Sequence, residues 1–202
     1  MNDVRLVPAG SGESEYTEKR STFLGHLRRV ETEEEARAFI AEMRKKYHDS
    51  RHNCWCYICG GAERYSDDGE PQGTAGIPML EVFRKEGVSS VVCVVTRYFG
   101  GILLGAGGLL RAYTKAASEA LAAAGIEELV PKAVIRVTCP YSLADRIRTE
   151  TLSSGIEIAS TDYGADVCFR VVTKADCADN YISGIFDMTS GTVLPVIEQE
   201  LS

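Results

Sequence analysis

The chain lacks an uninterrupted apolar stretch of the length that crosses a bilayer, which takes about 20 residues. Its N-terminal region contains Glu13, Glu15 and Glu18 where a secretory signal would have an apolar core. We therefore expect neither a transmembrane span nor a signal peptide, and no membrane partner.

Basic residues are in the minority, with 22 Lys and Arg against 29 Asp and Glu and a net charge of −7. The part before Pro131 carries 16 basic and 19 acidic residues, and the rest carries 6 and 10. Neither part attracts nucleic acid by bulk charge. Contact with RNA or another phosphate ligand therefore needs a local patch, for which the candidates are Arg44, Lys45, Lys46, Arg51, Arg97, Arg111 and Lys115.

The seven cysteines are odd in number and are not concentrated in a short disulfide framework. This distribution predicts reduced thiols and a cytoplasmic location. His52, Cys54, Cys56 and Cys59 form the densest group of metal-ligand types, but His52 and Cys56 on one strand would lie about 13 Å apart. We expect no metal site here. His52 and Cys54 share a strand face, yet no third group is identifiable that would orient a catalytic Cys–His pair.

The 202 residues, 45% of them apolar, are enough for a buried core and for one or two domains. Residues 1–15 are polar, with Pro8, Gly10 and Gly12, and predict a flexible N-terminus. Pro131, after the acidic pair Glu127 and Glu128, marks a boundary. The predicted domains are therefore 16–130 and 131–202.

Apolar periodicity in the first domain predicts strands at 22–30, 52–58 and 88–95, and helices at 32–47, 75–85 and 108–123. Thr32 is the expected N-cap of the first helix, with Glu35 completing a capping box. Gly125 is expected to end the third helix. The nearly continuous apolar run at 88–95 is typical of a strand that is covered on both faces.

The second domain predicts strands at 134–139, 156–162, 167–173 and 192–197, with helices at 142–153 and 176–188. Ser142 and Asp145 are the expected capping pair of the first of these helices. The order β-α-β-β-α-β is that of a ferredoxin-like unit. The fold class expected for the whole chain is α+β.

An acidic loop at 66–76 contains Asp67, Asp68 and Glu70. Loop carboxylates are ligands for hard cations, but the spacing does not match an EF-hand, because the twelfth position from Asp67 is Pro78. Asp-Gly and Glu-Pro are also strong turn formers. A turn and a functional carboxylate cluster therefore both remain open.

A glycine-rich loop follows at 97–111, just before a helix whose N-terminus favours anions. It fails the dinucleotide fingerprint, because the third glycine is replaced by Leu110, and it lacks the Lys-Ser/Thr pair of a P-loop. We therefore expect no nucleotide cofactor. The remaining interpretations are close packing around the glycines, or an anion site in which Arg97, Arg111 and Lys115 contact phosphate and Tyr98 stacks on bases.

The residues of these two loops resemble the IMPACT/YigZ family. The resemblance rests on residues 64–71, 73–76, 78–80, 95–101 and 103–113, together with residues 19–21, Phe23, Arg51, His52 and Cys54. It implies a first domain similar to domain IV of elongation factor G and to a small-subunit ribosomal protein, and a ferredoxin-like second domain of the kind that bacterial members carry. Eukaryotic members are implied to regulate translation through an activator of the amino-acid-starvation kinase, a role that does not transfer automatically to this two-domain chain.

The leading hypothesis is a translation-linked protein, without cofactor or metal, that binds RNA, the ribosome or a translation factor. The alternatives are an enzyme acting on a small phosphorylated or nucleotide ligand, and a protein-interaction module without RNA contact. The candidate site residues are His52, Asp67, Asp68, Glu70, Thr74, Arg97, Tyr98, Gly100, Gly101, Gly105, Gly107, Gly108, Arg111 and Lys115.

Overall fold

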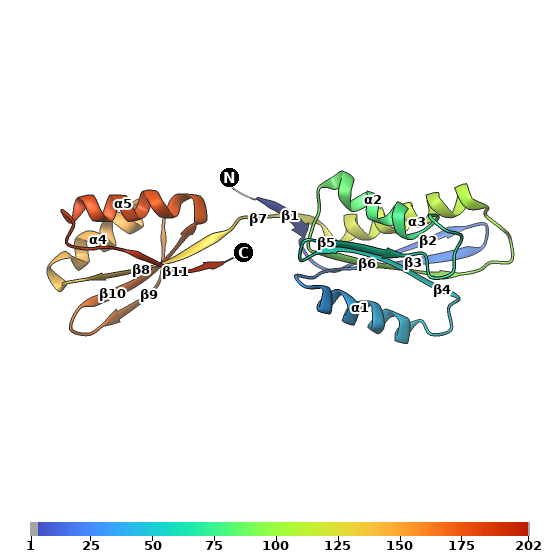
Figure 1. Cartoon of the computed structure of the whole chain (residues 1–202), viewed down its shortest axis with the longest axis horizontal. Coiled ribbons are helices and arrows are strands. Elements are labelled where there is room, and N and C mark those ends of the chain that lie inside the picture. Colours follow the sequence, from blue (N-terminus) through green and yellow to red (C-terminus); the bar gives the residue numbers. More distant parts are fainter. Residues whose placement is uncertain (1–3, 202) are drawn as a thin grey trace. The chain divides into compact units, whose positions relative to one another are not determined.

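The computed structural model describes residues 4–201, the last two by their backbone only. The chain forms two compact units, one of Arg5–Glu128 and one that begins at Leu129 and includes Val4 (Figure 1). Each unit combines helices with a mainly antiparallel sheet, which confirms the α+β class. No helix among the described residues is both long and apolar enough to cross a membrane.

A five-stranded antiparallel sheet with the order β2-β3-β6-β4-β5 forms the centre of the first unit. Its strands are β2 (Gly12–Glu18), β3 (Ser21–Arg29), β4 (His52–Cys59), β5 (Ala62–Ser66) and β6 (Val91–Tyr98). Helices α2 (Gly76–Glu86) and α3 (Ala106–Ala124) cover one face, and α1 (Glu33–Lys46) covers the other (Figure 1). The central strand β6 is consequently buried from Val91 to Arg97, as its apolar run predicts.

Helix α1 begins where its capping sequence predicts. The Thr32 hydroxyl accepts a hydrogen bond from the Glu35 amide, and the Glu35 carboxylate accepts one from the Glu31 amide. Its apolar stripe, which includes Phe39 and Ile40, packs against the α1-facing side of β6.

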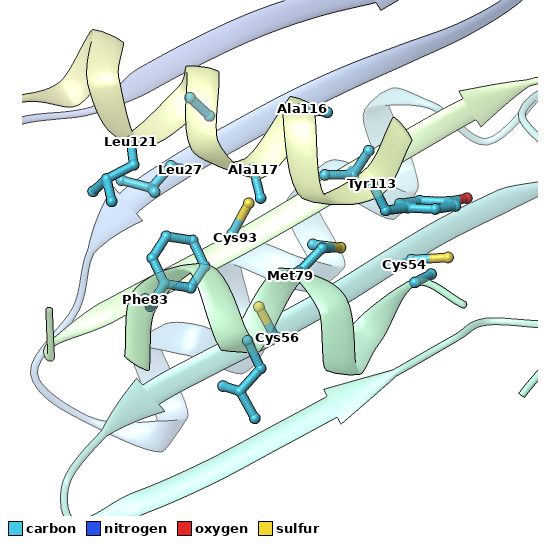
Figure 2. Close-up of a cluster of buried hydrophobic side chains, with 14 of the residues drawn as sticks. Leu27, Cys54, Cys56, Met79, Phe83, Cys93, Tyr113, Ala116, Ala117 and Leu121 are labelled. Atoms are coloured by element: carbon cyan, nitrogen blue, oxygen red, sulfur yellow. The ribbon is translucent and has the colours of Figure 1, made fainter. Parts of the chain in front are cut away.

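The core between the sheet and helices α2 and α3 contains three buried thiols (Figure 2). Cys54, Cys56 and Cys93 point into this layer, where they pack with Met79, Phe83 and the α3 residues. Small side chains on α3 allow a close approach to β2, and a Cβ on Gly12 would lie only 2.0 Å from the Ala120 carbonyl oxygen. These three cysteines are therefore core residues.

The predicted flexible N-terminus is wrong for the described residues of that segment; residues 1–3 lie outside them. Strand β1 (Arg5–Pro8) pairs with β7 (Ile126–Leu129), and β2 begins at Gly12. Polar residues suit β2 because it is an edge strand with exposed Glu13 and Glu15. Strand β2 packs against α3, and the Ser14 hydroxyl donates a 2.7 Å hydrogen bond to the Ala116 carbonyl oxygen.

The second unit has a four-stranded sheet with the order β11-β8-β10-β9. Its elements follow as β8 (Lys132–Cys139), α4 (Tyr141–Ser153), β9 (Glu157–Tyr163), β10 (Val167–Lys174), α5 (Ala178–Met188) and β11 (Val196–Leu201). Ile135, Phe169, Ile147 and Ile185 are among the residues of its separate core.

Two local predictions for this unit are wrong. Pro140 is the N-cap of α4 and no side chain caps the helix, so the Ser142–Asp145 pair does not form. The last strand begins at Val196 rather than at position 192, because the chain turns at Ser190 and Gly191, both with positive φ.

Candidate functional site

The two loops meet at one end of the sheet of the first unit. His52 at the start of β4 pairs in register with Arg97 near the end of β6, and Arg97 also pairs with Phe23 of β3. The β2–β3 turn at Lys19 and Arg20 lies at this same end. We call residues 67–75, residues 99–105 and this turn the two-loop end.

Asp67 caps helix α2 from a distance along the chain. Its carboxylate accepts hydrogen bonds from the backbone amides of Gly73 at 2.8 Å, Ala75 at 3.0 Å and Gly76 at 2.8 Å. These amides stand at a helix N-terminus, where a negative charge is favoured. Asp67 is thereby engaged in organising the loop.

The neighbouring acidic-loop residues are also held inside the fold. The Asp68 carboxylate accepts hydrogen bonds from Arg44 and from the Asn53 amide, both at 2.7 Å. The His52 ring donates through Nδ1 to the Asp68 carbonyl oxygen at 2.8 Å, so its hydrogen sits on Nδ1. The Thr74 hydroxyl donates to the Pro71 carbonyl oxygen at 2.6 Å.

Arg97 and Glu70 form a buried ion pair. The Arg97 guanidinium donates to both Glu70 carboxylate oxygens, at 2.7 and 3.0 Å, and the Tyr113 hydroxyl donates to one of them at 2.8 Å. Arg97 is 6% exposed and Glu70 is 8% exposed. The expected contact between Arg97 and phosphate is inconsistent with this arrangement, because its charge is already neutralised inside the domain.

The Cys54 thiol is a poor nucleophile. Burial raises its pKa above the ordinary value, and the thiol donates to the Asp67 carbonyl oxygen at 3.0 Å. His52 makes its hydrogen bond to Asp68 rather than to Cys54. Within residues 4–199 no group of three or more His, Cys, Asp or Glu side chains is placed to hold a metal ion.

The glycines of the second loop are accounted for by the backbone. A Cβ on Gly100 would lie 2.0 Å from the Arg20 carbonyl carbon, so glycine lets this loop touch the β2–β3 turn. Gly101 and Gly105 have positive φ, and Gly107 and Gly108 lie in the first turn of α3. The Tyr98 hydroxyl donates a hydrogen bond to the Asp49 carboxylate, and this hydrogen bond raises the pKa of Tyr98 to about 12.

The loop also exposes apolar side chains, of which Phe99 lies under the Arg97 guanidinium group, 5.4 Å from the centre of its ring. Leu103 is 82% exposed, Phe99 is 47% exposed and Ile102 is 42% exposed. An isolated exposed apolar residue is ordinary, whereas three of them within residues 99–103 form a cluster of the kind found at contact surfaces. Ile102 and Leu103 were not among the candidates from the sequence, because an apolar side chain in a loop does not show from the sequence alone whether it is buried or exposed.

Exposed cations stand on the two neighbouring segments, the β2–β3 turn and helix α3. Lys19 and Arg20 are exposed and both adopt left-handed backbone conformations, with φ of 45° and 67°. Arg111 is exposed and has no ion-pair partner among the described side chains, whereas Lys115 lies over the Tyr16 ring and 3.8 Å from Glu119. Lys19 and Arg20 could have been found as a two-residue connection between alternating segments.

Comparison with known proteins identifies the chain. The Impact N-terminal domain matches residues 19–121, which include both loops and the turn, and a domain of unknown function, DUF1949, matches residues 137–192. The chain belongs to the IMPACT family. The IMPACT N-terminal match covers four of the five strands of the sheet that positions the two-loop end, all but β2.

Relatives with this two-part organisation occur in bacteria. The chain is 38% identical to the IMPACT family member YvyE of Bacillus subtilis, over 90% of this chain and 85% of the relative. It is 33% identical to the IMPACT family member YigZ of Escherichia coli, over 93% and 95% of the two chains. The protein IMPACT of Oryctolagus cuniculus is 34% identical over 51% of this chain.

A solved structure confirms the arrangement of elements. A crystal structure described as that of a hypothetical protein matches with a TM-score of 0.66 and 31% identity over 98% of both chains.

Proposed function

We propose that this IMPACT family member is a cytoplasmic, translation-linked protein that binds structured RNA, as presented by a ribosome, through the two-loop end. The observation that supports this most directly is the exposed loop of Phe99, Ile102 and Leu103, which leads into the helix α3 that carries the unpaired cation Arg111. Aromatic and apolar side chains stack on unpaired bases, and cations contact the neighbouring phosphates.

The structure changes which residues carry this proposal. Arg97, Asp67, Asp68 and Glu70 position the loops instead of touching a ligand. The phosphate contacts are instead made by Lys19, Arg20 and Arg111. Lys115 makes a weaker contribution, because it is already close to Glu119. Because the patch has only a few cations, binding is expected to weaken with rising salt in proportion to this small number of phosphate contacts.

The fold adds a second line of support. The β-α-β-β-α-β order of the second unit and its strand order β11-β8-β10-β9 favour the ferredoxin-like comparison. We propose that the first unit is similar to domain IV of elongation factor G, which fits a protein that meets the ribosome.

Co-sedimentation with ribosomes and with structured RNA across a salt series tests the proposal. Arg111→Ala is expected to weaken binding several-fold and to lower the salt dependence by about one phosphate contact. Lys85→Ala is the matched control, because Lys85 is an exposed cation in the last turn of α2, away from the loops. Binding that is absent, or that both variants reduce equally, contradicts the proposal.

A protein partner without RNA is the second candidate, favoured by the 82% exposure of Leu103. Complexes that survive nuclease treatment but are lost in the Leu103→Ser variant would favour a protein partner over RNA. The enzymatic alternative has lost its proposed base and metal ligands, since the acidic-loop carboxylates are engaged within the domain.

A further inference from the structure

The second unit contains a cavity of about 650 Å³ that the proposed RNA contact does not use. It is lined by the start of β8, the end of α4, the start of β9, the end of β10 and one side of α5. Its volume is within the range of about 300–1,000 Å³ that small-molecule sites occupy.

The cavity has an apolar wall. Ile156, Tyr181 and Ile185 line it, and the Tyr181 hydroxyl is already bonded to the Thr151 hydroxyl at 2.7 Å. The buried tyrosine therefore presents its ring rather than a free polar group. Such a wall favours a ligand with an apolar body.

Gly184 indicates that space at this cavity matters. It lies in the interior of α5, where glycine destabilises a helix relative to alanine. A Cβ at this position would meet no atom within 4 Å and φ is not positive, so neither packing nor backbone conformation requires glycine. Because Gly184 lines the cavity, its missing side chain leaves room for an occupant.

Charges of both signs line the same cavity. Lys132 and Lys174 stand directly opposite each other on β8 and β10, an arrangement that destabilises a sheet. Glu150 and Glu157 also line the cavity. None of the four forms an ion pair with another side chain among residues 4–199.

We propose that this cavity binds a small zwitterion with an apolar body, of the class of apolar amino acids and short apolar peptides. The lysine pair receives the ligand carboxylate, the glutamates receive its ammonium group, and the apolar body lies along Ile156, Tyr181 and Ile185. A simple anion would meet the two glutamates unfavourably, and a simple cation would meet the two lysines in the same way.

The site binds its ligand without reacting with it. Cys177 lines the cavity, but a hydrogen bond with Asp176 raises the pKa of its thiol, which lowers its reactivity at neutral pH. Cys177 is nonetheless exposed, whereas Cys54, Cys56, Cys59, Cys93 and Cys139 are buried and Cys168 is half-buried. It therefore serves as a native reporter of occupancy.

Alkylation of Cys177 in the full-length protein, followed by mass spectrometry in mildly alkaline buffer, tests the proposal. The probe is the dipeptide leucyl-leucine, compared with N-acetyl-leucyl-leucine, which lacks the ammonium group, and leucyl-leucinamide, which lacks the carboxylate. We expect leucyl-leucine to protect Cys177, and each blocked form to bind about tenfold more weakly, because a charge on the protein is left without its partner. Isothermal titration calorimetry gives the affinities.

Variants of the cavity provide the controls. Gly184→Leu fills the space and is expected to abolish protection, whereas Gly184→Ala is expected to retain it and to raise the melting temperature. Lys174→Gln is expected to weaken binding of leucyl-leucine and also to raise the melting temperature, because it relieves the repulsion with Lys132. A purely structural lysine would not give this combination.

Three results would overturn the proposal. The first is no protection at about 10 mM leucyl-leucine, where even a site with a Kd near 1 mM is almost filled. The second is equal protection by either blocked form, and the third is unchanged protection in both Gly184→Leu and Lys174→Gln. Ribosome co-sedimentation of Gly184→Leu is expected to match wild type, which separates this proposal from the RNA surface.

Discussion

Single side chains in the acidic loop show how a motif can look catalytic and be structural. Asp67 gathers three backbone amides, Asp68 joins Arg44 to β4, and Glu70 neutralises Arg97. Each carboxylate is thereby matched to a particular donor. Substitution in this loop is expected to alter the first unit's stability before it alters any contact with a partner.

Asp67→Ala is expected to destabilise the first unit by about 2–4 kcal/mol, because amides near the start of α2 lose their acceptor. Asp67→Asn keeps an oxygen for Ala75 and Gly76 but loses the charge, so its effect should be intermediate. Urea unfolding measures both variants. Equal stability of Asp67→Ala and wild type would contradict the capping role.

His26 is expected to make stability depend on pH. Burial, and then Lys46, lower its pKa below 6.5, although Glu13 at 3.3 Å acts in the opposite direction. The neutral ring is therefore favoured in the folded state, so stability is complete above pH 6.5 and decreases as pH falls through that value.

Urea unfolding at neutral and mildly acidic pH checks this prediction for His26. His26→Gln, which cannot titrate, is expected to lose less stability than wild type between the two conditions. Its neighbours Glu13 and Tyr47, the latter stacked on the His26 ring, remain in place. The same pH dependence in both proteins would assign the effect to other groups.

Among the elements, the β2–β3 turn combines strain with exposed charge. A two-residue turn with both φ angles positive normally has Asn and Gly, not Lys19 and Arg20. The strained cations stand beside the exposed loop of the two-loop end. Backbone strain of this kind is found mainly at functional sites, so the combination of strain and exposed charge supports a role of the turn in binding.

The double variant K19N/R20G is expected to stabilise the first unit by about 1 kcal/mol and to weaken RNA binding. K19A/R20A is the matched control, because it removes both charges without relieving the backbone. It should weaken binding without a gain in stability, as measured by urea unfolding and co-sedimentation. Undiminished RNA binding in both variants would remove the turn from the proposed surface.

At the scale of the whole molecule, the chain has separate cores for its two units. Ile147→Ala, at a fully buried position of α4, is expected to destabilise the second unit by about 3 kcal/mol. Calorimetry should show a lower transition temperature for that unit and an unchanged one for the other. A single transition that moves as a whole would show that the units unfold together.

Local sequence patterns determined much of this protein. The apolar spacing of α1, its cap at Thr32 and the buried run of β6 depend on neighbours in the chain, so the sequence was enough to predict them. The residues of the two loops identified the family in the same way. The edge strand β2 was missed because its packing partner, α3, is about a hundred residues away.

Only the tertiary structure decided what the candidate residues do. The sequence favours Arg97 as a phosphate ligand. In the structure, Glu70, 27 positions earlier in the chain, neutralises its charge inside the domain. The cavity of the second unit likewise exists only once α4, α5 and three strands come together. The sequence does not show whether a charged side chain is buried or which distant residue it contacts. Burial and such long-range partners determine whether its charge is neutralised within the fold or available to a ligand.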